Sequence, residues 1–266
     1  MRDALVVCIM TLFLIFSSCI PNQDLVYMQD KNGDNDSIPS QITMKQKPYR
    51  VQVNDVLSIR VKALDQKLVK MFNPIGEEGN ISSNTVEQLY FDGFTVDNHG
   101  NIRIPTVGEV NVLNYTIEEI RIKIEERLLK DYFKKEANVF VNVKLAGLRY
   151  TVNGEVTTPG TKILYQEKVN IFEAIANVGE ITLEGDRKDV IILRNYPQGQ
   201  KIHHLDLTSR DVINSPYYFI QPNDIIYVKP VKQKSWGTGK TGFETFTTVI
   251  SVLSFVTTTI LLIKNL

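Results

Sequence analysis

Two apolar and almost uncharged runs lie at opposite ends of this 266-residue chain, at residues 4–16 and 245–263. They constrain the fold more than any other feature, because runs of this kind are typical of segments that enter a membrane. The stretch between them is polar enough to be water-soluble and long enough for one or two compact domains. We therefore expect a soluble, two-domain body with a membrane-directed segment at each end.

The N-terminal run has the pattern of a secretory signal peptide, with one arginine, a short apolar stretch and then small residues. Its end, Phe-Ser-Ser-Cys, resembles a bacterial lipobox, in which the cysteine is lipidated and becomes the mature N-terminus. We therefore predict lipidation at Cys19. The alternative is an ordinary signal peptide with a chance cysteine at this position.

Cysteine usage favours the lipidated form. Cys8 lies in the segment that would be removed, and Cys19 would carry the lipid. The mature chain then has no thiol for a disulfide or a metal site, although it is exported. A lipid together with a C-terminal membrane helix would supply two attachment points, which is enough for stable anchoring.

The C-terminal run, 244–264, predicts a transmembrane helix. About nineteen residues at about 1.5 Å each span roughly 28 Å, the thickness of a hydrocarbon core. Four hydroxyl residues recur at spacings of four, three and four, so they share one face and are the candidate pore-lining residues: Thr247, Ser251, Ser254 and Thr258. The opposite, lipid-facing side carries Phe246, Val249, Val252, Leu253, Val256, Ile260 and Ile263.

Two interpretations of this hydroxyl face remain open. Apolar residues contribute only about −0.3 to −0.6 kcal/mol each to insertion, so a lone helix with this many hydroxyls inserts marginally. A ring of helices that turns the hydroxyls inward would line an uncharged, wet lumen. Alternatively, Ser and Thr allow two helices to pack closely in lipid. Trp236 and Lys264 are predicted at the membrane–water interfaces.

The intervening sequence divides the chain further. We predict a signal peptide (1–18), a lipidated N-terminus and mobile tether (19–46) with a short sticky stretch at 25–28, a first domain (47–145), a second domain (146–231), a Gly-rich hinge (232–243) and the transmembrane helix (244–264). Residues 64–90 have the composition of a loop insertion.

The first domain is predicted to be α+β. Strands are expected within 49–61 and 93–112, with a hairpin turn at 98–101, and a further strand at 137–145. Between them, Thr116 and Glu119 form a capping-box pattern ahead of a helix whose apolar face carries Ile117, Ile120, Ile124 and Leu128.

The second domain is predicted to have the order β-β-α-β-β, which suggests a β-grasp-like sheet crossed by one helix. Its strands flank Pro159-Gly160, and Asn170 and Glu173 cap a short helix that ends at Gly179.

A short internal repeat connects the two domains. The segments YRVQVNDVLSI (49–59) and YFIQPNDIIYV (218–228) share Tyr, Gln and Asn-Asp at matching offsets. The expected structural turns are Asn54-Asp55 and Asn223-Asp224, because an Asx turn fixes a chain reversal before a strand.

These motifs, in this order, resemble a known family. The segments YRVQVNDVLSIRV, GFTVDNHGNIRIPTVGEVNV and TIEEIRIKIEERL resemble the polysaccharide export domain. The segments from VNGEVTTPGTKIL to FIQPNDIIYVKP resemble a soluble-ligand-binding (SLBB) β-grasp domain. With its lipobox and C-terminal helix, the chain is similar to Wza-like outer-membrane polysaccharide export lipoproteins.

The resemblance implies a homo-oligomeric ring, classically an octamer, with soluble domains in the periplasm and a helical barrel across the outer membrane. Capsular polysaccharide or exopolysaccharide would leave through the lumen, delivered by an inner-membrane copolymerase. This chain has one clear β-grasp repeat where the best-known pattern has two, which puts the height of the periplasmic part and the subunit number in question.

No catalysis is expected. Gly239-Lys240-Thr241 ends like a phosphate-binding loop, but the motif needs glycine where Lys234 stands. Adjacent His203 and His204 on a strand would point to opposite faces, so they do not share a metal. Equal numbers of basic and acidic residues, 30 each, give no nucleic-acid footprint. We expect no cofactor, metal or nucleic acid.

A rival interpretation from another functional class is a membrane-anchored, periplasmic ligand-binding or adaptor protein without a pore. Such a protein would have the same sequence features, but its terminal helices would not assemble into a barrel. The oligomeric state therefore discriminates the two.

Overall fold

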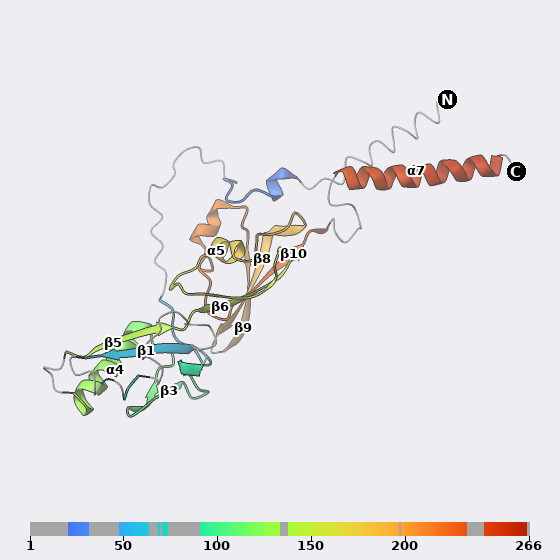
Figure 1. The fold of residues 1–266 in the computed structure, drawn as a ribbon. Coiled ribbons are helices and arrows are strands. Elements are labelled where there is room, and N and C mark those ends of the chain that lie inside the picture. Colours follow the sequence, from blue (N-terminus) through green and yellow to red (C-terminus); the bar gives the residue numbers. More distant parts are fainter. Residues whose placement is uncertain are drawn as a thin grey trace.

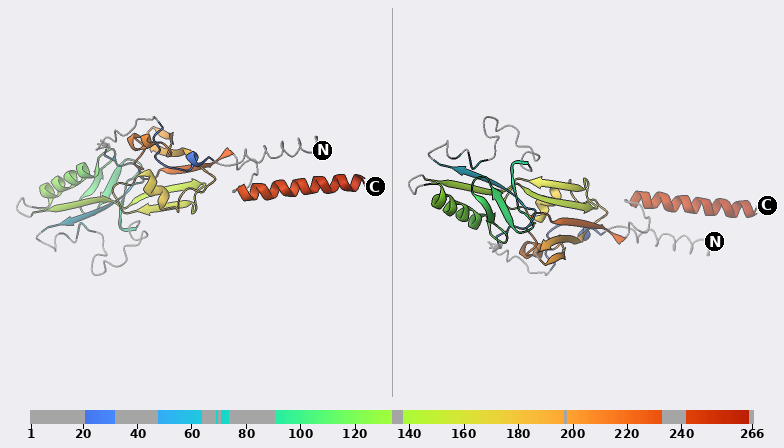
Figure 2. Two further views of the ribbon diagram at one scale, coloured as in Figure 1. Left: turned by 90° about the horizontal axis from the view of Figure 1, so that it is seen from above. Right: turned by 90° about the horizontal axis from the view of Figure 1, so that it is seen from below.

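The structure is a computed structural model that describes residues 21–31, 48–63, 69, 71–73, 91–133, 138–196, 198–232 and 242–264. Two α+β units follow one another along an elongated molecule, and a helix extends beyond the second unit (Figures 1 and 2). Each unit has its own hydrophobic core, one formed between residues 51 and 143 and the other between residues 148 and 228. The predicted mixture of helices and sheets is confirmed.

The first unit contains a three-stranded antiparallel sheet in the order β2-β1-β5 and a two-stranded hairpin, β3-β4. Its strands are β1 (Val56–Lys62), β2 (Phe94–Thr95), β3 (Asn101–Ile104), β4 (Gly108–Asn111) and β5 (Phe140–Leu145). Alternate residues of β1, namely Leu57, Ile59 and Val61, are buried, so one face of this strand forms the core.

Helix α4 (Ile117–Asp131) covers this core. The predicted capping box is confirmed: the Thr116 hydroxyl accepts from the Glu119 amide at 3.2 Å, and the Glu119 carboxylate accepts from the Thr116 amide at 2.7 Å. Ile120, Ile124 and Leu128 are completely buried, as their helical spacing predicts.

The turn at 98–101 differs from the prediction. Gly100 has a positive φ of 81° and its amide donates to the carbonyl of Asp97 at 2.9 Å, so the chain does reverse there. However, β2 before the turn pairs with β1, whereas β3 after it pairs with β4. The hairpin is therefore formed around residues 105–107. Strand pairing across the sheet decides its position, and the strongest turn signal in the sequence does not.

The second unit is a five-stranded sheet in the order β7-β6-β10-β8-β9. Its strands are β6 (Leu148–Gly154), β7 (Gly160–Leu164), β8 (Gly185–Tyr196), β9 (Gly199–Leu205) and β10 (Ile225–Pro230). The first and last strands, β6 and β10, lie parallel to each other, and the other pairs are antiparallel.

One helix, α5 (Ile171–Ala176), covers the sheet, and a 3-10 helix, η5 (Arg210–Asn214), precedes β10. Asn170 and Glu173 form the predicted capping box, and Gly179 has the left-handed φ of 79°. The predicted order β-β-α-β-β omits one strand, β9. Its first four residues are exposed, so it has no alternation of buried apolar residues to reveal it.

The predicted tether contains a segment that is held on the second unit. Residues 21–31, including η2 (Asn22–Asp24), lie along it, where the Gln29 amide donates to the Thr208 carbonyl at 2.7 Å. Tyr27 packs edge-on against Phe172 at 5.4 Å between ring centroids. Ion pairs add to these contacts, for example Lys31 to Asp206 at 2.6 Å.

The C-terminal helix α7 (Gly242–Lys264) extends away from both units in Figures 1 and 2. Within the described residues, a search for helices that are both long enough and apolar enough to cross a bilayer finds none. The membrane-spanning assignment of 244–264 therefore stays a prediction.

Candidate functional site

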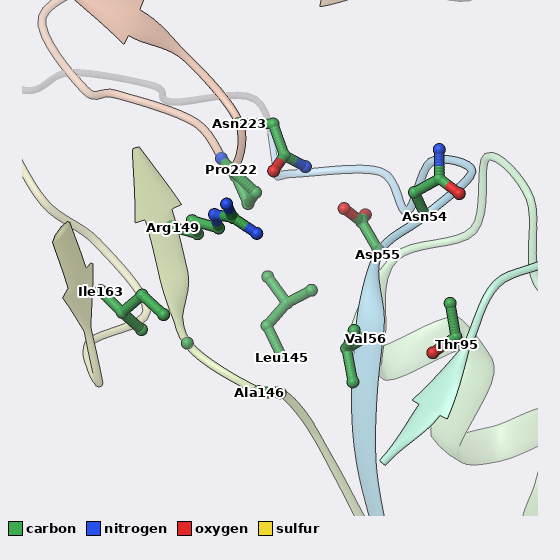
Figure 3. A pocket seen from close by; sticks show the side chains of 11 residues that line it. Asn54, Asp55, Val56, Thr95, Leu145, Ala146, Arg149, Ile163, Pro222 and Asn223 are labelled. Atoms are coloured by element: carbon green, nitrogen blue, oxygen red, sulfur yellow. The ribbon is translucent and has the colours of Figure 1, made fainter. Parts of the chain in front are cut away.

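A cavity of about 380 Å³ lies at the junction of the two units. It is lined by Asn54, Asp55, Val56, Thr95, Leu145, Ala146, Gly147, Arg149, Ile163, Pro222 and Asn223. Figure 3 shows side chains from both units facing this space. Both Asn-Asp turns of the internal repeat contribute to it, so a sequence feature of each domain meets at one site.

In the first unit, the chain reverses at Asn54, which has a positive φ of 69°. The Asn54 amide donates to the Val96 carbonyl, and the Val96 amide donates to the Asp55 carbonyl, both at 2.9 Å. Gln52 closes the turn, since its carbonyl accepts from the Asp55 amide at 3.3 Å and its amide donates to Asp55 Oδ2 at 2.9 Å. The aspartate thus holds the turn through its side chain.

The second unit repeats this arrangement at Asn223, with φ of 65°. The Asn223 amide donates to the Arg149 carbonyl at 2.6 Å, and the Thr151 amide donates to the Asp224 carbonyl at 3.0 Å. The Gln221 amide donates to Asp224 Oδ2 at 2.7 Å. In the first unit, one residue, Val96, makes both backbone hydrogen bonds to the turn. In the second unit, two residues of β6 share this role, because β6 runs parallel to β10 whereas β2 is antiparallel to β1.

The two aspartates differ in their partners. Asp55, 3% exposed, receives a hydrogen bond from the Tyr49 hydroxyl at 2.7 Å. Asp224, 1% exposed, receives a bidentate pair from Arg194, with Nε to Oδ1 at 3.0 Å and a terminal nitrogen to Oδ2 at 2.8 Å. One carboxylate therefore has a neutral partner and the other a charged one.

Burial governs the protonation of these groups. It raises the pKa of the Asp55 carboxyl, although hydrogen bonds from Gln52 and Tyr49 oppose the shift. Burial, followed by the nearby Asp55 charge, raises the pKa of the Tyr49 phenol, which keeps it a hydrogen-bond donor. Burial also raises the pKa of Asp224, with Arg194 acting against it. We therefore expect Asp55 to be the more easily protonated of the two, since it has no ion-pair partner among the described residues.

Two residues, Ala146 and Gly147, connect β5 of the first unit to β6 of the second. The Ala146 amide donates to the Val56 carbonyl at 2.9 Å, which ties the linker to β1. Gly147 has a φ of 126°, and a Cβ there would lie 2.6 Å from Cγ2 of Ile163. Only glycine fits this position, so the linker passes close to the cavity wall in one defined conformation.

The predicted hydroxyl face lies on α7. Ser251 Oγ donates to the Thr247 carbonyl at 2.9 Å, and Thr258 Oγ1 donates to the Ser254 carbonyl at 2.7 Å. Such bonds to the preceding turn satisfy a hydroxyl within its own helix. These four residues and the candidate lipid-facing Val252, Leu253 and Val256 are exposed. The helix thus has no side packed on the body of the chain at these positions.

Other predicted residues lie outside the described part of the chain. These are Cys19, Trp236 and the side chains of Phe246, Val249, Ile260, Ile263 and Lys264. The Gly-Lys-Thr segment at 239–241 and residues 74–90 of the predicted insertion are also outside it. Their assignments stay predictions.

The two adjacent histidines have different partners. His203 stacks on Tyr217 with ring centroids 3.7 Å apart, whereas His204 Nδ1 lies 2.5 Å from Asp189 Oδ1. Burial lowers the pKa of His203. Among the described residues, no group of three or more His, Cys, Asp or Glu side chains could hold a metal ion.

Sequence reasoning missed three residues of this junction: Tyr49, Arg149 and Arg194. Tyr49 belongs to the internal repeat, so its matching position offered a signal. Arg149 and Arg194 each lie on a strand, and nothing in their local sequence distinguishes them from a solvated arginine. Only the packing of β6 and β8 at one end of the sheet brings them to the turns.

The chain is similar to known proteins of one functional class. A family described as "Polysaccharide biosynthesis/export protein" matches residues 43–144. A curated relative, the EPS I polysaccharide export outer membrane protein EpsA of Ralstonia solanacearum, is 26% identical over 193 residues, which cover 71% of this chain and 50% of that relative. EpsA of Ralstonia nicotianae is 28% identical over 157 residues, which cover 58% of this chain and 40% of that relative.

The chain spans about half the length of the curated relatives it matches. The family match covers β1 to β5 and α4, which is the first unit with its Asn54-Asp55 turn. The similarity to the Ralstonia solanacearum relative extends over 193 residues, which is longer than the first unit alone. Residues 43–144, which form the first unit, are therefore similar to the polysaccharide biosynthesis/export protein family.

Proposed function

We propose that this chain is the subunit of an outer-membrane translocon that exports a capsular polysaccharide or exopolysaccharide. The family match over residues 43–144 is the observation that carries the proposal. The curated relatives, both named as polysaccharide export outer membrane proteins, support the substrate class and the membrane. The chain's role would be that of a passive conduit. The buried aspartates at the junction, Asp55 and Asp224, stabilise turns through their side chains.

The second unit is proposed to be an SLBB β-grasp domain. The central parallel pair β6-β10 and the single covering helix α5 support this assignment. The two soluble units would face the periplasm as stacked rings, and an inner-membrane copolymerase would deliver the polymer to them.

Membrane attachment is proposed at both ends of the chain. A lipid on Cys19 would lie two residues before the segment 21–31 that is held on the second unit. Exposed apolar residues of α7, such as Phe255 at 74% and Leu262 at 60%, need a partner that the described part of one chain does not supply. We propose that neighbouring α7 helices and lipid cover them, with Thr247, Ser251, Ser254 and Thr258 facing the lumen.

The decisive experiment is the oligomeric state of the full chain in detergent. Light scattering and particle imaging should show a closed ring, for which eight copies are the expectation from the family resemblance. A chain that stays monomeric in both measurements would contradict the translocon and favour a membrane-anchored adaptor. Cells lacking the chain should retain polymer, and re-expression should restore its export.

Two further measurements test the attachment. Cys19→Ala should abolish labelling with radioactive palmitate, and unchanged labelling would rule out acylation at this residue. Cysteine introduced at Ser251 or Ser254 should react with water-soluble thiol reagents in membranes, whereas cysteine at Leu253 should not. Equal reactivity at all three positions would contradict the proposed facing of α7.

A further inference from the structure

We propose that the cavity between the two units is a binding site for a sugar residue that carries a carboxylate. In this site Arg149 binds the acid group, and Asp55 accepts hydrogen bonds from sugar hydroxyls. That the ligand is a saccharide rests on the proposed export function. That it is an acidic saccharide rests on the side chains that face the cavity.

The first of these side chains is Arg149, the cavity's cation. It lies at the start of β6, where its carbonyl accepts the Asn223 amide at 2.6 Å, so its backbone is held by the second turn. Figure 3 shows its guanidinium reaching into the cavity beside Pro222. Within the described residues, this guanidinium makes no ion pair or hydrogen bond. A planar guanidinium binds a carboxylate with two parallel hydrogen bonds, and this makes Arg149 a ready partner for an acid.

The second side chain is Asp55, on the opposite wall. Its two hydrogen bonds, from Tyr49 and Gln52, both go to Oδ2. In the described part of the chain, Oδ1 accepts none, and Figure 3 shows the carboxyl group directed into the cavity. Asp224 in the matching turn has both oxygens occupied, by Arg194 and Gln221. Asp55 therefore keeps an acceptor that the turn itself does not use, in a residue only 3% exposed.

These two groups together select the ligand. A simple anion such as phosphate would pair with Arg149, but it would bring its whole charge close to Asp55, which repels it. A neutral sugar would satisfy Asp55 but would leave the guanidinium without its charged partner. A sugar acid carries both an anionic group and hydroxyl donors, so it satisfies both walls at once.

The rest of the cavity fits a saccharide. Its volume of about 380 Å³ lies within the range of roughly 300–1,000 Å³ usual for small-ligand sites. The carboxamides of Asn54 and Asn223 and the Thr95 hydroxyl add both donors and acceptors at its edge. Val56, Leu145 and Ile163 supply apolar surface for the C–H faces of a sugar ring.

The site also spans the junction between units. Ala146 and Gly147, which connect β5 to β6, line the cavity together with both turns. A ligand held between Arg149 of the second unit and Asp55 of the first would therefore bind the two units together. Binding should accordingly reduce hydrogen exchange at the amides of both turns.

The test is a titration of the full chain in detergent with glucuronate, glucose and inorganic phosphate, followed by isothermal titration calorimetry. Glucuronate should bind, and glucose and phosphate should each bind at least tenfold more weakly. Arg149→Gln should weaken glucuronate binding at least tenfold, and Arg149→Lys, which keeps the charge but not the planar fork, should weaken it less. The matched control is Arg103→Gln, an exposed arginine of β3 outside the cavity, which should leave binding unchanged.

A variant of Asp55 tests the opposite wall of the cavity independently. Asp55→Asn should weaken glucuronate binding several-fold, because a carboxamide is a poorer acceptor for hydroxyls, and should strengthen phosphate binding, because the repelling charge is removed. A circular dichroism spectrum confirms that each variant is folded. Glucuronate binding that is unaffected in Arg149→Gln, or equal affinity for glucose, overturns the proposal. Stronger binding of phosphate than of glucuronate identifies a plain anion site and overturns it too.

The failure of this inference can be distinguished from failure of the export function. A chain that forms rings and restores export, but binds no sugar acid through Arg149, overturns the inference alone. A monomeric chain that still binds glucuronate through Arg149 overturns the translocon and leaves the site in place.

Discussion

The two Asn-Asp turns have nearly the same backbone and bury an aspartate at the same offset, yet they stabilise it differently. Asp224 has a bidentate guanidinium, whereas Asp55 has a phenol and one unused oxygen. The backbone of the turn is therefore independent of how the carboxylate is neutralised. The Arg194–Asp224 ion pair stabilises the second unit, whereas the Tyr49–Asp55 hydrogen bond leaves one carboxylate oxygen available at the cavity.

The largest difference should follow from removing the charged partner. Arg194→Met leaves the Asp224 carboxylate buried and unpaired, so the free energy of unfolding should fall by about 3–5 kcal/mol. Urea unfolding of the full chain, followed by circular dichroism, measures it. Adding Asp224→Asn to the same chain should recover much of the loss. A double variant as unstable as the single one would show that packing by Arg194, and not its charge, is what matters.

The neutral partner should matter less. Tyr49→Phe removes one donor from a buried carboxylate and should cost about 1–3 kcal/mol in the same urea measurement. Tyr218 occupies the matching position of the second turn, but its hydroxyl makes no hydrogen bond within the described residues. Tyr218→Phe is therefore the matched control and should cost less than about 0.5 kcal/mol. Equal losses at the two positions would contradict the proposed difference between the turns.

The turn backbones should respond alike. Asn54→Ala and Asn223→Ala place a Cβ residue without a turn-forming side chain at φ of 69° and 65°, so each should cost about 1 kcal/mol. Glycine adopts this conformation freely, so Asn54→Gly and Asn223→Gly should lose only a few tenths of a kcal/mol. If alanine were harmless in one turn only, the two backbones would not be equivalent.

The smallest effect is a change with pH. Burial raises the pKa of Asp55 in the folded chain, so the folded state holds its proton to higher pH than the unfolded state does. Its contribution to stability is thus present below the ordinary aspartate pKa and is lost as the pH rises through the raised one. Tyr49 donates to this carboxyl, and Arg149 faces it across the cavity.

Asp55→Asn should remove that pH dependence. The slope of the unfolding free energy against pH should become more positive, by less than one full proton, or about 1.4 kcal/mol per pH unit. Urea unfolding at a series of pH values from the acidic range to neutral measures this slope. An unchanged slope would mean that other carboxyls, including Asp224, carry the pH dependence.

Much of the local structure could be predicted from the sequence. The capping boxes at Thr116 and Asn170 and the buried face of α4 follow from residue type and spacing, because they depend on contacts within one turn of helix. The repeat of Gln and Asn-Asp likewise located both turns, since an Asx residue acts on the backbone beside it. The exposed strand β9 and the docked segment 21–31 gave weak signals, because their partners are distant in sequence.

The candidate site could not be predicted in the same way. Arg149, Arg194 and Tyr49 come from three different segments, and no periodicity connects them. Only the parallel pairing of β6 with β10 and the close passage of Gly147 beside Ile163 bring the two turns to one cavity.

The sequence by itself determined the order of the segments, the helical and strand character of most of them, and the two matched turns. These properties depend on local propensity, capping and the period of apolar residues. The tertiary structure alone decided which aspartate receives a guanidinium and which keeps an open oxygen. That choice depends on long-range packing between strands, where the identity of a neighbour is set by the sheet and not by the residues next to it in the chain.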